Sequence, residues 1–203
     1  MVYEGIKRML DILVAGAGLV LCAPLFGLIA LLIKLDSPGS IFFAHERVGR
    51  YGRKFKVLKF RTMVPDAPQR GIPVTAGDDP RITRIGRILR KTKLDELPQL
   101  WNVLKGDMSL VGPRPEVERY VQLWEPVLRE QVLRVRPGIT GLTQIRYRHE
   151  EALLAQQPDP EKYYREVLLP RKLASDVEYV QRRSLAFDLY LLGRTIIALF
   201  ERE

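Results

Sequence analysis

An uncharged apolar segment near the amino terminus constrains this chain more than any other feature of its sequence. Residues 12–33 form a run of 22 residues, ILVAGAGLVLCAPLFGLIALLI, without a charged side chain. As a helix, this run would be about 33 Å long at roughly 1.5 Å per residue. That length is sufficient to cross a hydrocarbon core of about 30 Å, so the sequence predicts an element that enters a membrane.

Three other interpretations of this segment stay open. A cleavable signal peptide would also begin with basic residues, but its apolar run would be shorter and a small-x-small cleavage site would precede Lys34. A buried helix of a globular core is the second alternative, although cores rarely require so long an uncharged run. The third alternative is a straight helix that spans the membrane.

Proline and the flanking charges favour a re-entrant helix over a straight span. Pro24 lacks a backbone donor and clashes with the preceding turn, so the helix is expected to break at Ala23 and Pro24. Basic residues flank the run on both sides: Lys7, Arg8, Lys34 and Arg47. A spanning helix usually carries such residues on one side only, so both ends are expected on the cytoplasmic face.

The charge distribution changes abruptly after the apolar run. Residues 34–93 carry 15 basic and 5 acidic side chains, a balance of +10 that exceeds the net charge of +9 for all 203 residues. A basic region directly after an apolar block indicates an anionic membrane surface or a phosphate ligand as its partner. One Cys excludes a disulfide scaffold, and two distant His argue against a His-built metal cluster.

The rest of the chain predicts a mainly α-helical fold with a small β-hairpin, an α+β class. β-Branched and aromatic residues predict two strands within 40–63, and prolines and glycines predict a loop over 64–80. Apolar periodicity predicts a basic amphipathic helix over 81–93, which either lies on anionic lipid or docks on the core with a solvated basic face. The other expected elements are a helix between Pro98 and Gly106, a helix after the Pro113-Arg114-Pro115 turn through Val132, a glycine-rich loop at 135–145 that leads into a strand, helical residues 160–183, and an apolar segment at 184–200.

Two adjacent carboxylates, Asp95 and Glu96, are the sharpest local feature of the sequence. They follow the basic region and lie near an expected helix start. One carboxylate could act as a nucleophile while the other holds a divalent metal beside a phosphate. The alternative is that Asp95 caps the helix and Glu96 favours the positive end of its dipole.

Four basic residues are candidate phosphate ligands: Lys59, Arg61, Arg90 and Arg114. Arginine binds phosphate bidentately, and Arg114, which is flanked by two prolines, would lose little entropy on binding. The alternative for each residue is a solvated or lipid-facing charge. No P-loop and no GxSxG motif occurs, and His45 and His149 are each isolated among polar residues.

Short motifs recur along nearly the whole chain in a specific order. The central group is Arg90-Lys91-Thr92 followed by Leu94-Asp95-Glu96-Leu97-Pro98. The other groups are Lys7-Arg8, Arg47-Val48-Gly49, Lys59-Phe60-Arg61-Thr62-Met63, Gly106-Asp107-Met108-Ser109, Val111-Gly112-Pro113-Arg114-Pro115, Arg136-Pro137-Gly138-Ile139-Thr140-Gly141, and Ser184, Asp188 and Thr195. Together they resemble the bacterial sugar transferase family, the monotopic polyprenyl-phosphate phosphoglycosyl transferases, in its small form.

The resemblance implies a reaction and a location. A sugar 1-phosphate would pass from a nucleoside diphosphate sugar, such as a UDP-sugar, to a polyprenyl phosphate, such as undecaprenyl phosphate. In such enzymes the residue matching Asp95 attacks the β-phosphate, UMP leaves, and the residue matching Glu96 helps to hold Mg²⁺. Residues 1–36 would form the re-entrant helix, and residues 37–203 would form a catalytic domain on the cytoplasmic face of the bacterial inner membrane.

One position departs from the family pattern, and two other classes of function stay open. Family members often have Ser before the helix-breaking proline, whereas Ala23 cannot hydrogen-bond the backbone groups freed at a break. A non-enzymatic adaptor that binds anionic lipid through its basic face is one alternative function. A nucleic-acid binder is another, but the basic region contains no recognised nucleic-acid motif, so no nucleic-acid partner is expected.

Overall fold

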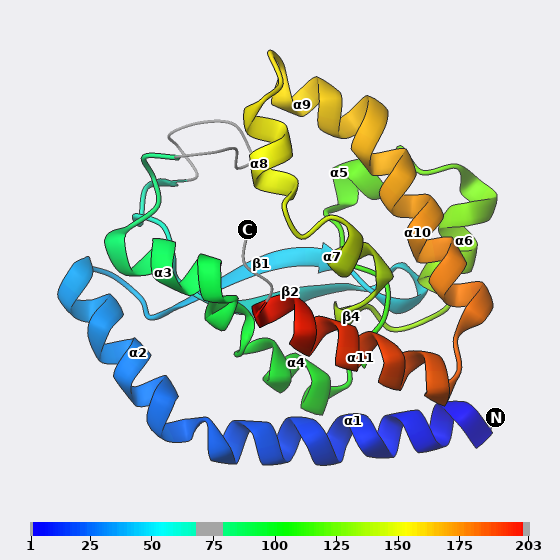
Figure 1. The fold of residues 1–203 in the computed structure, drawn as a ribbon, viewed down its shortest axis with the longest axis horizontal. Helices are drawn as coiled ribbons and strands as arrows, with labels where there is room; N and C mark the ends of the chain where they lie inside the picture. Colours follow the sequence, from blue (N-terminus) through cyan, green and yellow to red (C-terminus); the bar gives the residue numbers. More distant parts are fainter. Residues whose placement is uncertain (1, 68–78, 201–203) are drawn as a thin grey trace.

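The computed structural model describes residues 2–67 and 79–200, which form a mainly helical fold with two small sheets (Figure 1). The predicted α+β class is therefore confirmed. Most of the loop expected at 64–80 lies outside the described residues. The elements run in chain order as α1 (Val2–Leu21), α2 (Ala23–Asp36), β1 (Phe42–Val48), η1 (Arg50–Gly52), β2 (Lys54–Phe60), α3 (Arg84–Thr92), η3 (Leu94–Glu96), α4 (Gln99–Lys105), β3 (Ser109–Val111), α5 (Glu118–Val121), α6 (Pro126–Leu133), β4 (Gly138–Thr140), α7 (Leu142–Arg146), α8 (Glu150–Ala155), α9 (Pro160–Tyr163), the π-helical turn η4 (Tyr164–Leu168), α10 (Leu169–Arg182) and α11 (Leu185–Phe200).

The amino-terminal helix breaks where the sequence predicts. α1 and α2 bend by 59° around Cys22, with Pro24 in the first turn of α2, and the bend forms with Ala23 before the proline. Phe26 N still donates to Cys22 O at 2.9 Å, so the helical hydrogen bonding resumes directly after the proline. Among the described residues no single helix is long and apolar enough to cross a membrane, whereas α1 and α2 together meet that requirement by length and composition.

Polar side chains attach α1 to the rest of the molecule. Asp11 is buried, and its side chain accepts hydrogen bonds from Ser109 Oγ at 3.1 Å and from the backbone amide of Leu110. Arg8 donates to carbonyl oxygens at the end of α4, and Lys7 Nζ lies 2.7 Å from Asp188 Oδ2 on α11. Lys7 and Arg8 therefore attach α1 to α11 and α4. The prediction that both helix ends lie on one membrane face treats these two residues as free charges, but both have partners within the protein.

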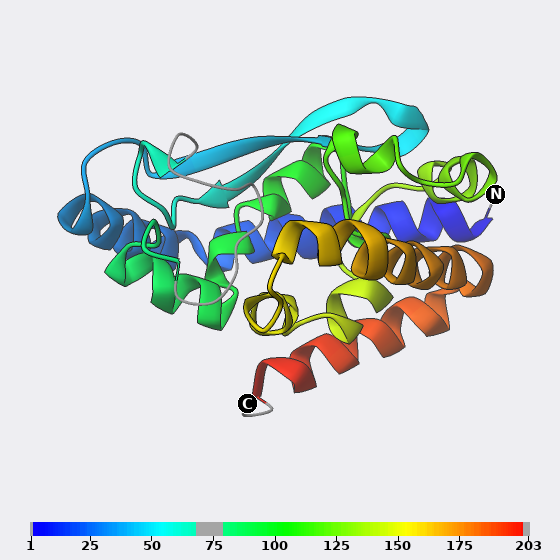
Figure 2. The same ribbon diagram turned by 90° about the horizontal axis from the view of Figure 1, so that it is seen from above.

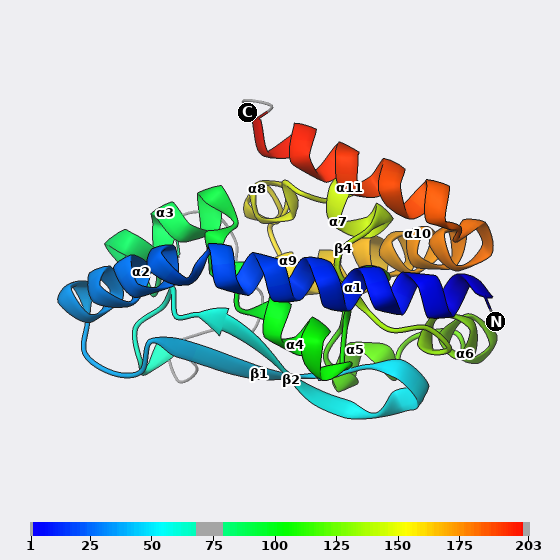
Figure 3. The same ribbon diagram turned by 90° about the horizontal axis from the view of Figure 1, so that it is seen from below.

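Large apolar side chains remain exposed along α1, α2 and α11. Figure 3 shows α1 and α2 across the near side of the molecule and α11 along one edge, with parts of α7, α8 and α10 visible between them. The exposed apolar side chains of these helices include Met9, Leu10, Ile12, Leu13, Val14, Val20, Leu21, Leu28, Leu31, Leu35, Leu189, Tyr190, Ile196 and Ile197. Clusters of exposed apolar side chains commonly mark surfaces that contact a membrane or a partner.

The hairpin and α4 form one side of the molecule, and α11 lies on the opposite side (Figure 2). β1 and β2 pair antiparallel with Phe42 opposite Phe60, as predicted for residues 40–63. Asn102 on α4 bonds to the β2 backbone, because its Oδ1 accepts from Leu58 N at 2.9 Å and its Nδ2 donates to Lys56 O at 2.8 Å. These two bonds fix α4 against β2, the strand that carries Lys59.

Two predicted elements differ from the structure. The single helix expected through Val132 is two short helices, α5 and α6, because Pro126 cannot continue a helix and the Glu125 side chain caps α6. The sequence predicts a strand after the glycine-rich loop at 135–145. The observed strand, β4, begins at Gly138 within that loop, and the chain becomes helical at Leu142.

The other helices occur where the sequence predicts. α3 begins after Thr83, whose side chain accepts from Gly86 N at 3.0 Å, and α4 ends at Gly106 with φ 96°. The segment 160–183 is helical through α9, η4 and α10. A large core cluster joins these last helices to α5 and α6 and includes Val48, Tyr120, Val121, Trp124, Val132, Leu154, Tyr164, Leu168, Leu169, Leu173 and Val177.

Candidate active site

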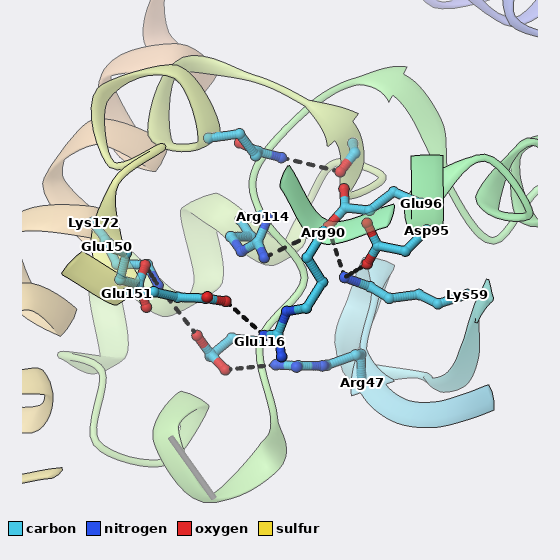
Figure 4. Close-up of polar contacts among 12 residues, drawn as sticks. Arg47, Lys59, Arg90, Asp95, Glu96, Arg114, Glu116, Glu150, Glu151 and Lys172 are labelled. Atoms are coloured by element: carbon cyan, nitrogen blue, oxygen red, sulfur yellow. Dashed lines mark hydrogen bonds and ion pairs between the residues drawn. The ribbon is translucent and has the colours of Figure 1, made fainter. Parts of the chain in front are cut away.

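Asp95 and Glu96 lie on the short turn η3, directly after Lys93 ends α3 in the left-handed conformation (φ 57°). Figure 4 shows both carboxylates turned toward Lys59 of β2. Lys59 Nζ lies 2.6 Å from Glu96 Oε1 and 3.9 Å from Asp95 Oδ2. Within residues 2–67 and 79–200, no hydrogen bond runs from a backbone amide to either carboxylate, so the helix-cap alternative finds no support.

One oxygen of Asp95 is buried without a partner. Asp95 is 6% exposed, and its Oδ1 has no hydrogen bond from any described group. A buried polar atom without a partner is costly, and in native proteins such atoms concentrate at functional sites. Burial raises the pKa of the Asp95 carboxyl above its ordinary value, although Lys59 opposes the shift. The Oδ1 atom is therefore free to bond to an electrophile or a cation.

Glu96 has the opposite electrostatic balance. Burial alone would raise the pKa of Glu96, but the Lys59 ammonium and the Arg114 guanidinium outweigh burial and hold the pKa well below its ordinary value. Neighbouring carboxylates with pKa values driven apart commonly have different roles in one site. Glu96 thus stays anionic, while Asp95 is the more basic of the two carboxylates.

Arg114 brings a second cation to the pair. Its Nη2 lies 4.0 Å from Glu96 Oε1, and its side chain is 36% exposed. The loop that carries it is held by the adjacent prolines and by a hydrogen bond of 3.4 Å from Arg114 N to Asp176 Oδ1. Among the described residues the guanidinium of Arg114 donates no side-chain hydrogen bond, so its donors can receive an anionic ligand.

Arg90, in the last turn of α3, also reaches this site (Figure 4). Its Nη2 donates to Glu151 Oε1 on α8 at 2.5 Å. Its Nη1 is buried and has no partner among the described residues. The structure thus brings together Asp95, Glu96 and three of the four predicted phosphate ligands, Lys59, Arg90 and Arg114.

The structure does not bring Arg61 to this cluster. Arg61 is 6% exposed, and its guanidinium donates to Pro38 O at 2.6 Å, Ser37 O at 2.7 Å and Ser37 Oγ at 2.9 Å. These acceptors follow α2, where a cation also complements the negative end of the helix dipole. In this structure Arg61 holds the segment that leaves α2, in a position that differs from the predicted phosphate contact.

A buried layer of charged groups behind Arg114 is absent from the sequence predictions. Glu116 accepts from Tyr164 Oη and from Arg47 Nη1, the latter at 2.8 Å. Lys172 Nζ donates to Glu150 Oε2 at 2.9 Å (Figure 4). It also donates to Tyr164 Oη at 3.0 Å. One signal could have revealed it, because Lys172 falls on the apolar stripe of α10 and a lysine there needs a buried partner.

The two carboxylates suit Mg²⁺ only together with a ligand. Within the described residues no group of three His, Cys, Asp or Glu side chains could hold a metal by itself. Mg²⁺ in enzymes often binds through one or two carboxylates and the phosphates of a substrate, and it keeps its remaining waters. Glu96, which stays anionic beside an Asp95 oxygen that has no partner among the described residues, fits that mode of binding.

Comparison with known proteins decides the family. The model of the family described as "Bacterial sugar transferase" matches residues 2–202. The chain belongs to the bacterial sugar transferase family. This sugar transferase is 40% identical over 207 residues to the exopolysaccharide production protein ExoY of Sinorhizobium fredii, with 95% of this chain and 84% of the relative covered.

Two further relatives carry names that state a reaction. The transferase is 42% identical over 204 residues to the UDP-glucose:undecaprenyl-phosphate glucose-1-phosphate transferase of Caulobacter vibrioides, covering 97% of this chain and 70% of the relative. It is 39% identical over 197 residues to the UDP-N-acetylgalactosamine-undecaprenyl-phosphate N-acetylgalactosaminephosphotransferase of Aeromonas hydrophila, covering 96% and 44% respectively. The two relatives are thus named for different sugars.

Proposed function

We propose that this enzyme is a polyprenyl-phosphate phosphoglycosyl transferase, which moves a sugar 1-phosphate from a UDP-sugar to undecaprenyl phosphate. The observation that carries the proposal is the buried Asp95 carboxylate. Among the described residues its Oδ1 has no partner, Lys59 and Arg90 lie near enough to lower its pKa, and Arg114 faces the adjacent Glu96. Cations around a carboxylate suit a reaction in which an anionic nucleophile meets anionic substrates. The names of the Caulobacter and Aeromonas relatives support the same class of substrates.

The reaction would proceed in two displacements. Asp95 Oδ1 attacks the phosphorus that carries the sugar, an aspartyl O–P bond forms, and the P–O bond to UMP breaks so that UMP leaves with the electron pair. A phosphate oxygen of undecaprenyl phosphate then attacks the same phosphorus and displaces the Asp95 carboxylate. One pocket thereby serves a soluble donor and a lipid acceptor in turn.

The surrounding residues of this chain support both displacements. Lys59, Arg90 and Arg114 offset the repulsion between Asp95 and the incoming phosphates, and they stabilise charge on the phosphoryl oxygens. Glu96 stays anionic and, together with the donor phosphates, would hold Mg²⁺. When bound, Mg²⁺ would neutralise charge on the diphosphate.

We also propose that residues 1–36 form a re-entrant membrane helix and that residues 37–203 form a catalytic domain on the cytoplasmic face of the inner membrane. The 59° bend and the exposed apolar side chains of α1, α2 and α11 support this arrangement. Cysteine probes at Gly5 and Ser40, with Cys22 replaced by Ala, should react from the same side of sealed vesicles. Reaction from opposite sides would show a spanning helix.

The substitution Asp95→Asn tests the proposed reaction. With Mg²⁺ and a UDP-sugar, the wild type should release UMP, and without acceptor it should add the mass of a sugar phosphate to the peptide that contains Asp95. Asp95→Asn should lose turnover by at least about a thousandfold. Glu130→Gln, an exposed carboxylate that pairs with Arg134, is the control and should keep full activity.

Full turnover by Asp95→Asn would exclude Asp95 as the nucleophile.

A non-enzymatic adaptor for anionic lipid is the second candidate function, and the exposed basic residues of α3 favour it. An adaptor would bind vesicles equally well as wild type and as Asp95→Asn, and neither protein would release UMP from any UDP-sugar.

A further inference from the structure

At the edge of the site, Arg90 forms an ion pair with Glu151, a residue to which the proposed reaction gives no role. Arg90 Nη2 lies 2.5 Å from Glu151 Oε1, and the Glu151 side chain is 47% exposed whereas that of Arg90 is 21% exposed. The other terminal nitrogen of Arg90, Nη1, is buried and has no partner within residues 2–67 and 79–200. The guanidinium is thus bound on one side by a solvent-accessible carboxylate and lacks a bond on the other.

The helix that carries Glu151 is held in place by other residues. Glu150 accepts from the buried Lys172 at 2.9 Å, and Leu154 is 1% exposed within the core cluster that contains Tyr164. Adjacent residues of an α-helix point about 100° apart, so Glu150 faces the buried layer while Glu151 faces Arg90. The Glu151 side chain can therefore rotate away from Arg90 while α8 stays where it is.

We propose that Glu151 is a residue of the donor phosphate site, whose carboxylate binds Arg90 between turnovers and is displaced by a phosphate of the nucleotide. This inference rests on the proposed function. A carboxylate and a phosphate make the same bidentate contact with a guanidinium, but a diphosphate carries more charge and more acceptor oxygens. An ion pair as exposed as this one changes a binding constant by about fivefold at most, so a nucleotide can displace Glu151 readily.

The exchange also has a consequence for product release. When UMP has formed, Glu151 competes with its phosphate for Arg90 and weakens UMP binding. A site that must empty before undecaprenyl phosphate can enter benefits from such a competitor. Glu151 thus favours the passage from the first displacement to the second.

Glu151→Gln tests this role. In the wild type, Mg²⁺-UDP binding is measured by calorimetry and UMP is measured as a product inhibitor. Glu151→Gln should bind UDP about two- to fivefold more tightly, and UMP should inhibit it more strongly by a similar factor. In the background Arg90→Gln, adding Glu151→Gln should change neither constant, because the competition requires the guanidinium. The melting temperature should be unchanged, since Glu151 is exposed.

Two control variants separate the contact from a general effect of charge. Glu130→Gln removes the same charge from an exposed pair with Arg134 and should leave UDP affinity unchanged. Glu151→Asp keeps the charge but is one methylene shorter, so it should behave like Glu151→Gln if the contact with Arg90 matters. UDP affinity equal to wild type in Glu151→Gln, or equal effects of Glu151→Gln with and without Arg90, would overturn the inference. If the inference about Glu151 fails in this way while the wild type still turns over UDP-sugars, the proposed function stands. If the wild type binds no UDP, both the inference and the proposed function are overturned.

Discussion

Asp95 and Glu96 are neighbours in the chain, yet their surroundings drive their pKa values apart. Glu96 accepts a hydrogen bond from Lys59 at 2.6 Å and faces Arg114. Asp95 lies farther from Lys59, at 3.9 Å, and one of its oxygens is buried with no partner in the described part of the chain. A single lysine can favour one carboxylate over another because its hydrogen bonds are directional and its charge acts more strongly at shorter distance.

The raised pKa of Asp95 predicts the acid limb of the pH profile. Asp95 must be ionised to attack, so activity should fall as the pH drops through its pKa, at a higher pH than an ordinary aspartate would give. Lys59 lowers this pKa, so Lys59→Gln should move the acid limb of kcat/KM to higher pH.

The matched control for this shift is Lys56→Gln, which removes the same charge from an exposed residue of the same strand. Its acid limb should coincide with that of the wild type. An acid limb that stays in place in Lys59→Gln would mean that a group other than Asp95 controls the activity.

At the scale of elements, Arg61 determines how the chain leaves α2. Arg61→Met would leave the carbonyl oxygens of Ser37 and Pro38 without their donor, so the free energy of unfolding should fall by about 2–4 kcal/mol. Denaturant unfolding measures this loss, and Arg87→Met, an exposed arginine of α3, should change it little. If Arg61 binds phosphate instead, Arg61→Met would raise the KM for UDP-sugar without changing stability.

The sheet of β3 and β4 requires glycine at position 138, where there is no room for a side chain. A Cβ at Gly138 would lie 2.1 Å from Gly112 N and 2.4 Å from Thr140 O, so Gly138→Ala should force the two backbones apart. We expect a loss of about 1–3 kcal/mol of unfolding free energy in chemical denaturation. Gly193→Ala is the control, because its Cβ would have no neighbour within 4 Å and alanine favours the helix α11. A neutral Gly138→Ala would show that the strands can separate at no cost.

At the scale of the whole molecule, apolar and basic surfaces lie close to the site. α1, α2 and α11 expose large apolar side chains, and α3, whose last turn supplies Arg90, exposes Arg84 and Arg87. Contacts between α2 and α3 include a hydrogen bond of 3.0 Å from Ile85 N to Asp36 Oδ2. The packing thereby places the basic helix between the proposed membrane element and the carboxylate pair.

A double charge reversal tests the role of this basic helix. Arg84→Glu with Arg87→Glu should weaken binding to vesicles that contain anionic lipid by at least about tenfold at low salt, and the loss should shrink as salt rises. Binding to vesicles of phosphatidylcholine, which is zwitterionic and has no net charge, should stay the same, because the apolar surface of the variant is intact. Co-sedimentation measures both quantities. Equal losses on the two kinds of vesicle would indicate that the variant has disturbed the fold and that the arginines have no specific contact with anionic lipid.

Local chemistry explains what the sequence by itself determined about this protein. The break at Pro24, the end of α4 at Gly106, the strands of the hairpin and the helix 84–92 follow from proline geometry, glycine conformation and apolar periodicity. Asp95 and Glu96 are also local, since they are adjacent and follow a basic helix. Each of these predictions depends on residues within one or two turns of one another.

Only the tertiary structure decided which charges meet. Lys59 and Arg61 are two residues apart and carry the same charge, but Lys59 faces Glu96 while Arg61 lies beyond the end of β2 and bonds to Ser37 and Pro38. Lys172 reaches Glu150 in the same way, from a helix distant in sequence. The partner of a long charged side chain depends on which backbone elements pack beside it, and that packing is set by apolar burial and by the cost of buried charge, which involve residues far apart in the sequence.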